Sequence, residues 1–186
     1  MSADIKILLV LLVVAIAFVI ATFNDLKVQR ISNVLCLRVF IVGCLLQLLL
    51  FQLPGLMNIL LGVLLPFVIL FPLFYLRALG AGDIKLMMAV GPMLVAQNML
   101  FSTLLYAVIF GGVTTLLFVI YQVGFKGIML TLTRYWQCLI TKTYFKAEQG
   151  EAASLKVPYA PALFLGWLWA CANDSGVTQA FKAFIA

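Results

Sequence analysis

The chain contains no histidine, and its 186 residues include only six aspartates and glutamates. Without histidine, a His-based catalytic triad, HExxH chemistry and the common zinc-binding spacings are excluded. The cysteines form no CxxC pair and are expected to be packing residues; they are Cys36, Cys44, Cys138 and Cys171. The sequence therefore predicts neither a metal site nor a cofactor.

Charge is also scarce. Charged residues make up 10% of the chain and hydrophobic residues 66%, whereas a soluble domain carries about 25% charged residues. The apolar runs 5–23 and 56–76 are long enough to cross about 30 Å of hydrocarbon. The first run exceeds a signal-peptide core and lacks a cleavage site before a polar segment, so we expect it to be retained. The sequence predicts an all-α, polytopic membrane helical bundle.

About six spans are predicted within a single domain of residues 1–186, at 5–23, 34–52, 56–76, 84–97, 99–123 and 157–173. The fourth is short, and Pro92 inside it is expected to kink the helix or end it early. Segment 124–156 is basic, with apolar residues at helical spacing before a polar loop at 147–154. It predicts an amphipathic helix on the cytoplasmic leaflet. An ordinary solvated connector and a seventh span are the alternatives.

The basic residues predict the orientation. If successive loops alternate sides, one side receives only Lys6 and Lys182, and the other receives Lys27, Arg30, Arg38, Arg77, Lys85, Lys126, Arg134, Lys142, Lys146 and Lys156. Such a bias marks the cytoplasmic side, so both termini are predicted to be periplasmic. The net charge of +6 is then no sign of nucleic-acid binding. Membrane lipids are the expected surroundings, and the oligomeric state stays open.

Two carboxylates stand out because no other acid lies between Asp4 and Glu148. They are Asp25, after the first span, and Asp83, before the fourth, so the predicted topology places both at the cytoplasmic end. A carboxylate at membrane depth costs roughly 2.5–3.5 kcal/mol and marks a candidate functional site. Two facing carboxyls resist ionising together, so one is protonated and one ionised, as an aspartic peptidase requires.

The segment before Asp83 contains two glycines. Gly80 and Gly82 permit a positive φ and close backbone approach, so an extended substrate segment is expected to bond along this loop. A simpler explanation remains open, in which Asp83 caps a helix after a tight turn. Asp25 would then be a charge at a helix end paired with Lys27 or Arg30, and Lys85 a membrane-side anchor.

Three segments together resemble the type IV prepilin peptidases. Residues 80–87 (GAGDIKLM) resemble the family's GxGDxKLM segment, residues 25–33 (DLKVQRISN) its other aspartate segment, and residues 157–162 (VPYAPA) its late VPYAPA segment. Lys27 and Ser32 depart from the common Arg and Pro without removing a catalytic group. The chain lacks the cysteine-bearing region that accompanies N-methylation, and so resembles the short peptidases of Flp/Tad-type pili.

The resemblance implies an aspartic endopeptidase of the bacterial inner membrane, with Asp25 and Asp83 as its catalytic pair. Its substrate would be a prepilin or pseudopilin, whose short basic leader is cut on the cytoplasmic side. Pro158 and Tyr159 are candidates for lining the substrate entry, although the proline suits a helix start equally well. Two alternatives stay open: a transporter or pilus-assembly subunit whose acids carry ions or protons, and a presenilin-type intramembrane protease.

Overall fold

The computed structural model describes residues 3–75, 79–141 and 157–185. Within these ranges the chain is helical and contains no strand. The helices are α1 (Ala3–Val28), α2 (Asn33–Phe51), α3 (Leu53–Tyr75), α4 (Ala81–Val95), α5 (Leu100–Thr141), α6 (Ala160–Asn173) and α7 (Ser175–Ile185). The predicted all-α membrane bundle is therefore confirmed.

Among the residues that the structure describes, four helical segments are long and apolar enough to cross a membrane: Asp4–Val28, Asn33–Phe51, Leu53–Tyr75 and Leu100–Gln122. The fourth and sixth predicted spans exist as helices, but α4 has 15 residues and α6 has 14. At a rise of about 1.5 Å per residue, each is shorter than a bilayer's hydrocarbon core of about 30 Å. Pro92 lies inside α4, which continues to Val95, two residues before the end of the predicted span 84–97.

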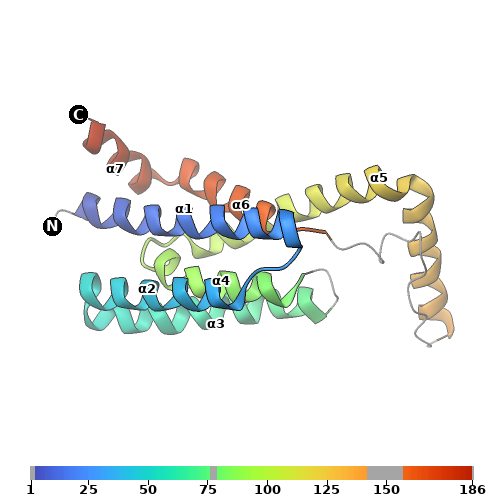
Figure 1. Ribbon diagram of the computed structural model, residues 1–186, viewed down its shortest axis with the longest axis horizontal. Coiled ribbons are helices and arrows are strands. Elements are labelled where there is room, and N and C mark those ends of the chain that lie inside the picture. Colours follow the sequence, from blue (N-terminus) through green and yellow to red (C-terminus); the bar gives the residue numbers. More distant parts are fainter. Residues whose placement is uncertain (1–2, 76–78, 142–156, 186) are drawn as a thin grey trace. The chain divides into compact units, whose positions relative to one another are not determined.

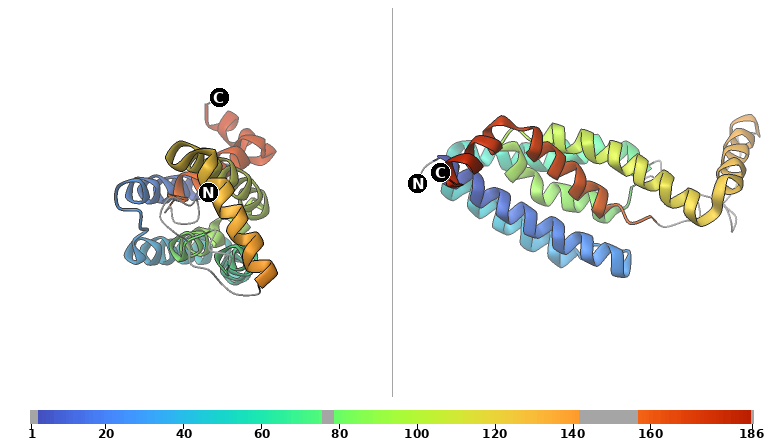
Figure 2. Two further views of the ribbon diagram at one scale, coloured as in Figure 1. Left: turned by 90° about the vertical axis from the view of Figure 1, so that its right-hand side faces the viewer. Right: turned by 90° about the horizontal axis from the view of Figure 1, so that it is seen from above.

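The chain forms two compact units. Unit 1 comprises Met1–Phe110 and Pro158–Ala186, and unit 2 comprises Gly111–Val157. In unit 1 the helices run back and forth between two ends (Figures 1 and 2). The end of α1 and the starts of α2, α4 and α6 meet at one end, which we call the aspartate end. The opposite end, which we call the terminal end, holds both chain termini.

Helix α4 is the most enclosed helix of unit 1, with ten of its 15 residues buried. It packs against α2 and α3, while α1 packs against α6 and α7. A Cβ added at Gly91 would collide with the backbone of Gly62 in α3. Small residues at such crossings let helices approach closely where lipid supplies no hydrophobic driving force.

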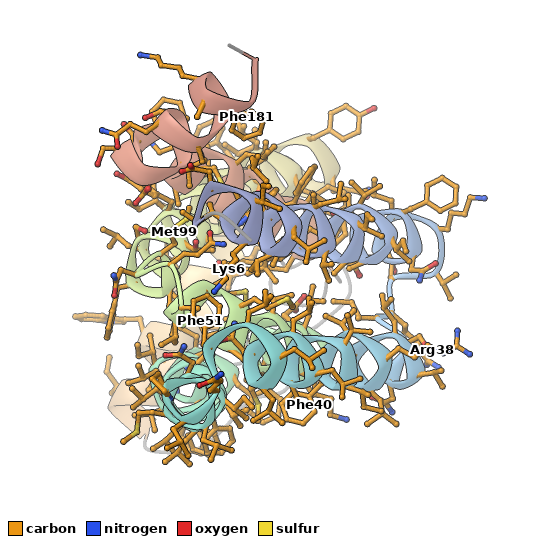
Figure 3. All side chains as sticks on the ribbon, turned by 90° about the vertical axis from the view of Figure 1, so that its left-hand side faces the viewer. Lys6, Arg38, Phe40, Phe51, Met99 and Phe181 are labelled. Atoms are coloured by element: carbon orange, nitrogen blue, oxygen red, sulfur yellow. The ribbon has the colours of Figure 1, made fainter. Side chains whose placement is uncertain are left out.

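Most outward-facing side chains of the spanning helices are apolar, with charged groups such as Arg38 near the helix ends (Figure 3). Large hydrophobic residues remain exposed along them, among them Leu49, Leu53 and Tyr75, each more than three-quarters exposed. Water would make this arrangement costly, whereas hydrocarbon satisfies it. The exposed apolar surface therefore agrees with a protein embedded in a membrane.

In unit 2, α5 is interrupted at Gly124, whose φ of 64° and ψ of −173° are not helical. This break falls where the predicted fifth span gives way to the amphipathic segment. The part of α5 beyond it exposes apolar side chains at helical spacing: Phe125, Met129, Leu132, Trp136 and Ile140. An amphipathic helix is therefore present to Thr141. Its position on the leaflet stays a prediction, and the polar loop at 147–154 lies outside the described residues.

Helix α7 was not predicted. It begins one residue after Asp174, whose Oδ1 accepts a hydrogen bond from the Val177 amide at 2.9 Å. Val177 and Ala180, three residues apart, are buried. The local signals for this helix were the capping aspartate and the three-residue apolar spacing that follows it.

Candidate active site

Asp25 lies in the last turn of α1, where it is 6% exposed. Its Oδ2 accepts a hydrogen bond from the Ala160 amide, at 2.9 Å, across 135 residues of sequence. Ala160 is the first residue of α6, and first-turn amides of a helix have no partner within the helix. The positive end of the α6 dipole therefore faces the Asp25 carboxylate.

Asp83 lies in the first turn of α4 and is 7% exposed. Its Oδ2 accepts a hydrogen bond from the Gly80 amide at 3.0 Å. The side chain thus reaches back to the residue before the helix, as in half of a capping box. Asp83 is thus not the N-cap residue after a tight turn that the simpler explanation required, because Gly80 is the N-cap and Asp83 is the third residue of the helix. Its bond to the Gly80 amide fixes the carboxyl at the aspartate end.

The two carboxyls lie close enough to influence each other. Asp83 lies outside the four long spanning segments, and burial raises its pKa to about 7. The Gly80 amide counteracts this rise, and the negative charge of Asp25 adds to it. Asp83 therefore holds a proton near neutral pH, beside a second carboxyl. The structure brings together the two acids that the sequence singled out.

The neighbouring lysines make other contacts. Lys85 donates from Nζ to Asn33 Oδ1 at 3.0 Å, which ties α4 to the start of α2. The Lys27 ammonium lies over the ring of Phe23, 4.2 Å from its centroid. The partner that the structure gives Asp25 is thus the backbone amide of α6, which the sequence analysis did not anticipate.

Gly80 and Gly82 do not use the positive φ that glycine permits. Gly80 has a φ of −81°, and Gly82 lies inside α4, which starts at Ala81. The helix begins at Ala81, earlier than predicted, so Gly82 and Asp83 both lie in its first turn. Close approach is nevertheless required at Gly82, where an added Cβ would lie 3.2 Å from Cβ of Ile31. Glycine therefore serves packing against the loop between α1 and α2.

Tyr159, at the start of α6, is buried, and Pro158 beside it is partly buried. The Tyr159 hydroxyl donates to the backbone oxygen of Ala107 in α5 at 3.2 Å. This bond anchors the N-terminus of α6, whose next residue contacts Asp25. The geometry gives Tyr159 a positioning role, while its predicted role in substrate entry stays a prediction.

A model of the type IV leader peptidase family matches residues 12–120, more than half of the chain. The chain belongs to the type IV leader peptidase family. It is accordingly a membrane peptidase, and the family implies prepilin-type substrates. The matched region contains both aspartates, and α6 follows it. Neither curated proteins nor solved structures gave a match.

Proposed function

We propose that this leader peptidase is an aspartic endopeptidase whose catalytic pair is Asp25 and Asp83. The observation that carries the proposal is their convergence: two buried acids, 58 positions apart in the sequence, share one end of unit 1. Burying two carboxyls together costs folding free energy, because at least one of them must stay protonated. Such arrangements are concentrated at functional sites. The electrostatic influence of Asp25 on Asp83 supports a pair that shares one proton.

The pair divides the chemistry of hydrolysis. The ionised carboxylate takes a proton from a water molecule, and the resulting oxygen nucleophile attacks the scissile carbonyl. The protonated carboxyl donates its proton to the carbonyl oxygen, which gives a tetrahedral intermediate with two hydroxyl groups. The carboxyl that took the proton from water then donates it to the leaving amine, and the other carboxylate takes a proton back from one hydroxyl, so that the peptide C–N bond breaks and the carbonyl forms again. The two carboxyls exchange roles as protons pass through them. No metal or cofactor enters these steps.

The substrate that suits this site is a type IV prepilin or pseudopilin of the Flp/Tad kind. Its leader is short and basic, and its mature part begins with a hydrophobic helix. The excess of basic residues in the predicted cytoplasmic loops supports cleavage on the cytoplasmic side. A hydrophobic substrate helix would reach the site through the bilayer, along the exposed apolar faces of the spanning helices.

Co-expression with candidate prepilins tests the proposal. Mass spectrometry of the pilin monitors leader removal. The wild-type enzyme is compared with the Asp25→Asn and Asp83→Asn variants. Each substitution keeps the shape of the side chain and removes the ionisable group, so we expect each to abolish cleavage. The mass of the product also gives the bond that is cut.

Asp4→Asn is the matched control, because Asp4 is an acid at the terminal end of unit 1. It should cleave like wild type. Western blotting of the membrane fraction shows whether each variant is inserted. Substantial cleavage by an inserted Asp25→Asn or Asp83→Asn protein would remove that residue from the catalytic pair.

A further inference from the structure

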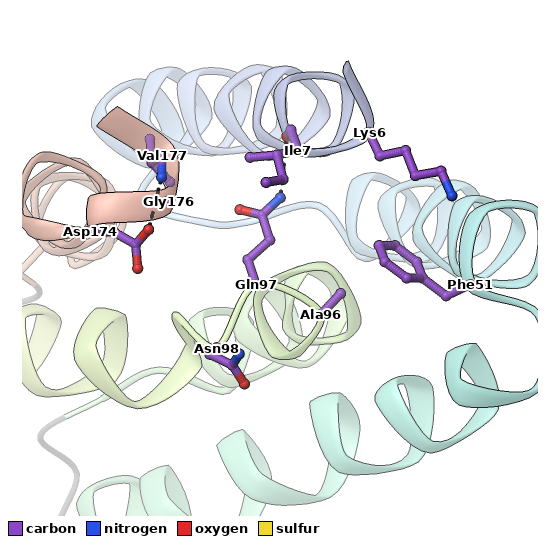
Figure 4. A pocket seen from close by; sticks show the side chains of 9 residues that line it. All are labelled: Lys6, Ile7, Phe51, Ala96, Gln97, Asn98, Asp174, Gly176 and Val177. Carbon is purple, nitrogen blue, oxygen red and sulfur yellow. Dashed lines mark hydrogen bonds between the residues drawn. The ribbon is translucent and has the colours of Figure 1, made fainter. Parts of the chain in front are cut away.

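A cavity of about 570 Å³ opens at the terminal end of unit 1, away from the two aspartates. The start of α1, the end of α2, the loop between α4 and α5, and the start of α7 form its walls (Figure 4). Its volume falls within the roughly 300–1,000 Å³ of small-molecule sites. The proposed peptidase chemistry makes no use of it.

One wall of the cavity carries a positive charge. The Lys6 ammonium donates to the backbone oxygen of Leu50 at 3.2 Å and lies 5.9 Å from the centroid of the Phe51 ring. An ammonium has three N–H donors, so this contact leaves donors for a ligand. Lys6 is also one of only two basic residues predicted on this side of the membrane.

The other wall presents hydrogen-bond acceptors. The Gln97 side chain donates from Nε2 to the Ile7 oxygen at 3.2 Å, but its Oε1 is buried without a partner among the described residues. Asp174 uses Oδ1 to cap α7, and a carboxylate has further lone pairs to offer. In Figure 4, Gln97 lies between Asp174 on one side and Lys6 on the other. A buried acceptor without a donor is costly, so a ligand that supplies N–H groups would stabilise this wall.

The cavity lies where the long apolar segments end. Lys6 is near the start of the segment Asp4–Val28, and Phe51 is the last residue of Asn33–Phe51. Lipid headgroups begin at the level where spanning segments end. A ligand here would therefore reach the cavity from the headgroup layer, with room for acyl chains along the exposed apolar faces.

We propose that this cavity binds a phosphoethanolamine group, with the phosphate against Lys6 and the primary ammonium against Gln97 Oε1 and Asp174. The ammonium supplies the N–H donors that the acceptor wall lacks, and Lys6 forms a charge-assisted hydrogen bond with the phosphate. A phosphocholine group has no N–H and leaves Gln97 Oε1 unpaired. Phosphatidylethanolamine of the bilayer and free glycerophosphoethanolamine share the required chemistry.

Native mass spectrometry of the full-length protein tests the proposal. The protein is reconstituted in nanodiscs of equimolar dioleoyl phosphatidylethanolamine and phosphatidylcholine, and the retained lipid is identified. We expect wild type to retain phosphatidylethanolamine at least about tenfold over phosphatidylcholine. Asp174→Asn should lose most of this preference, while the asparagine still caps α7. Lys6→Gln removes a phosphate contact that both lipids make, so it should lower the amount of both lipids retained without changing their ratio. The control Lys182→Gln changes an exposed lysine outside the cavity and should retain the wild-type preference.

Equal retention of the two lipids by wild type would overturn the proposal. An unchanged preference in Asp174→Asn, or an unchanged amount of retained lipid in Lys6→Gln, would overturn it as well. Competition with glycerophosphoethanolamine separates the two sources. Displacement at concentrations equal to the lipid would assign the site to a free solute, and retention of the lipid would assign it to the bilayer. Leader cleavage is assayed on the same samples, so a failure at this cavity is distinguishable from a failure of the proposed peptidase activity.

Discussion

The contact between α3 and α4 determines where Asp83 lies, and Gly91→Ala tests it directly. The added methyl group would overlap the backbone of Gly62, which has no flexible side-chain end that could move aside. The two helices must therefore separate for the methyl group to fit. Because α4 carries Asp83 in its first turn, such a shift is also expected to disturb the proposed catalytic pair.

The size of the expected loss in the free energy of unfolding follows from a comparison with Gly112→Ala. Gly112 is also helical, in α5, but a Cβ added there meets no atom within 4 Å. Both substitutions gain the helix propensity of alanine, up to about 1 kcal/mol, so this gain cancels between them. Overpacking costs about 1–3 kcal/mol, and contact with rigid backbone places Gly91→Ala at the upper end. We expect Gly91→Ala to be less stable than Gly112→Ala by about 3 kcal/mol.

The assay measures unfolding of the purified proteins in a mild detergent. A denaturing detergent is added stepwise, and circular dichroism monitors the loss of helix. Leader cleavage in the same preparations shows whether Asp83 has moved. Gly62→Ala changes the other side of the same contact and should behave like Gly91→Ala. Equal stability of Gly91→Ala and Gly112→Ala would refute the reasoning, because the two helices could not then be in backbone contact at Gly91.

Three further predictions follow from the aspartate end. The pKa of about 7 at Asp83 means that the protonated acid is lost as pH rises, so the cleavage rate should fall about tenfold per pH unit above pH 7; a flat profile from pH 6 to 9 would contradict this. Tyr159→Phe removes the hydrogen bond that holds the start of α6, at a cost of about 1 kcal/mol. It should lower kcat about fivefold and leave KM unchanged. A rise in KM alone would instead indicate that Tyr159 contacts the substrate. Lys85→Gln replaces an exposed donor to Asn33 and should change unfolding stability by less than about 0.5 kcal/mol, whereas a larger loss in the same detergent titration would assign that bond a structural role.

Much of the fold was predictable because hydrocarbon imposes a simple rule. Every backbone group in lipid must be satisfied within the chain, so long apolar runs become helices. The runs that predicted α1, α2, α3 and the first part of α5 needed no further information. Helix α7 could not be identified in this way, because it is too short and too polar for a span and is fixed by packing against α1.

The sequence alone determined that the chain is a helical membrane protein and that Asp25 and Asp83 are its exceptional acids, because a carboxylate at membrane depth is costly and marks a candidate functional site. It also predicted their common side, through the distribution of basic residues. Only the tertiary structure decided the partners of each acid. Asp25 accepts its hydrogen bond from the Ala160 amide, 135 residues away in the sequence. Every residue except proline has a backbone N–H, so the sequence cannot show which amide binds Asp25, and helix packing decides it.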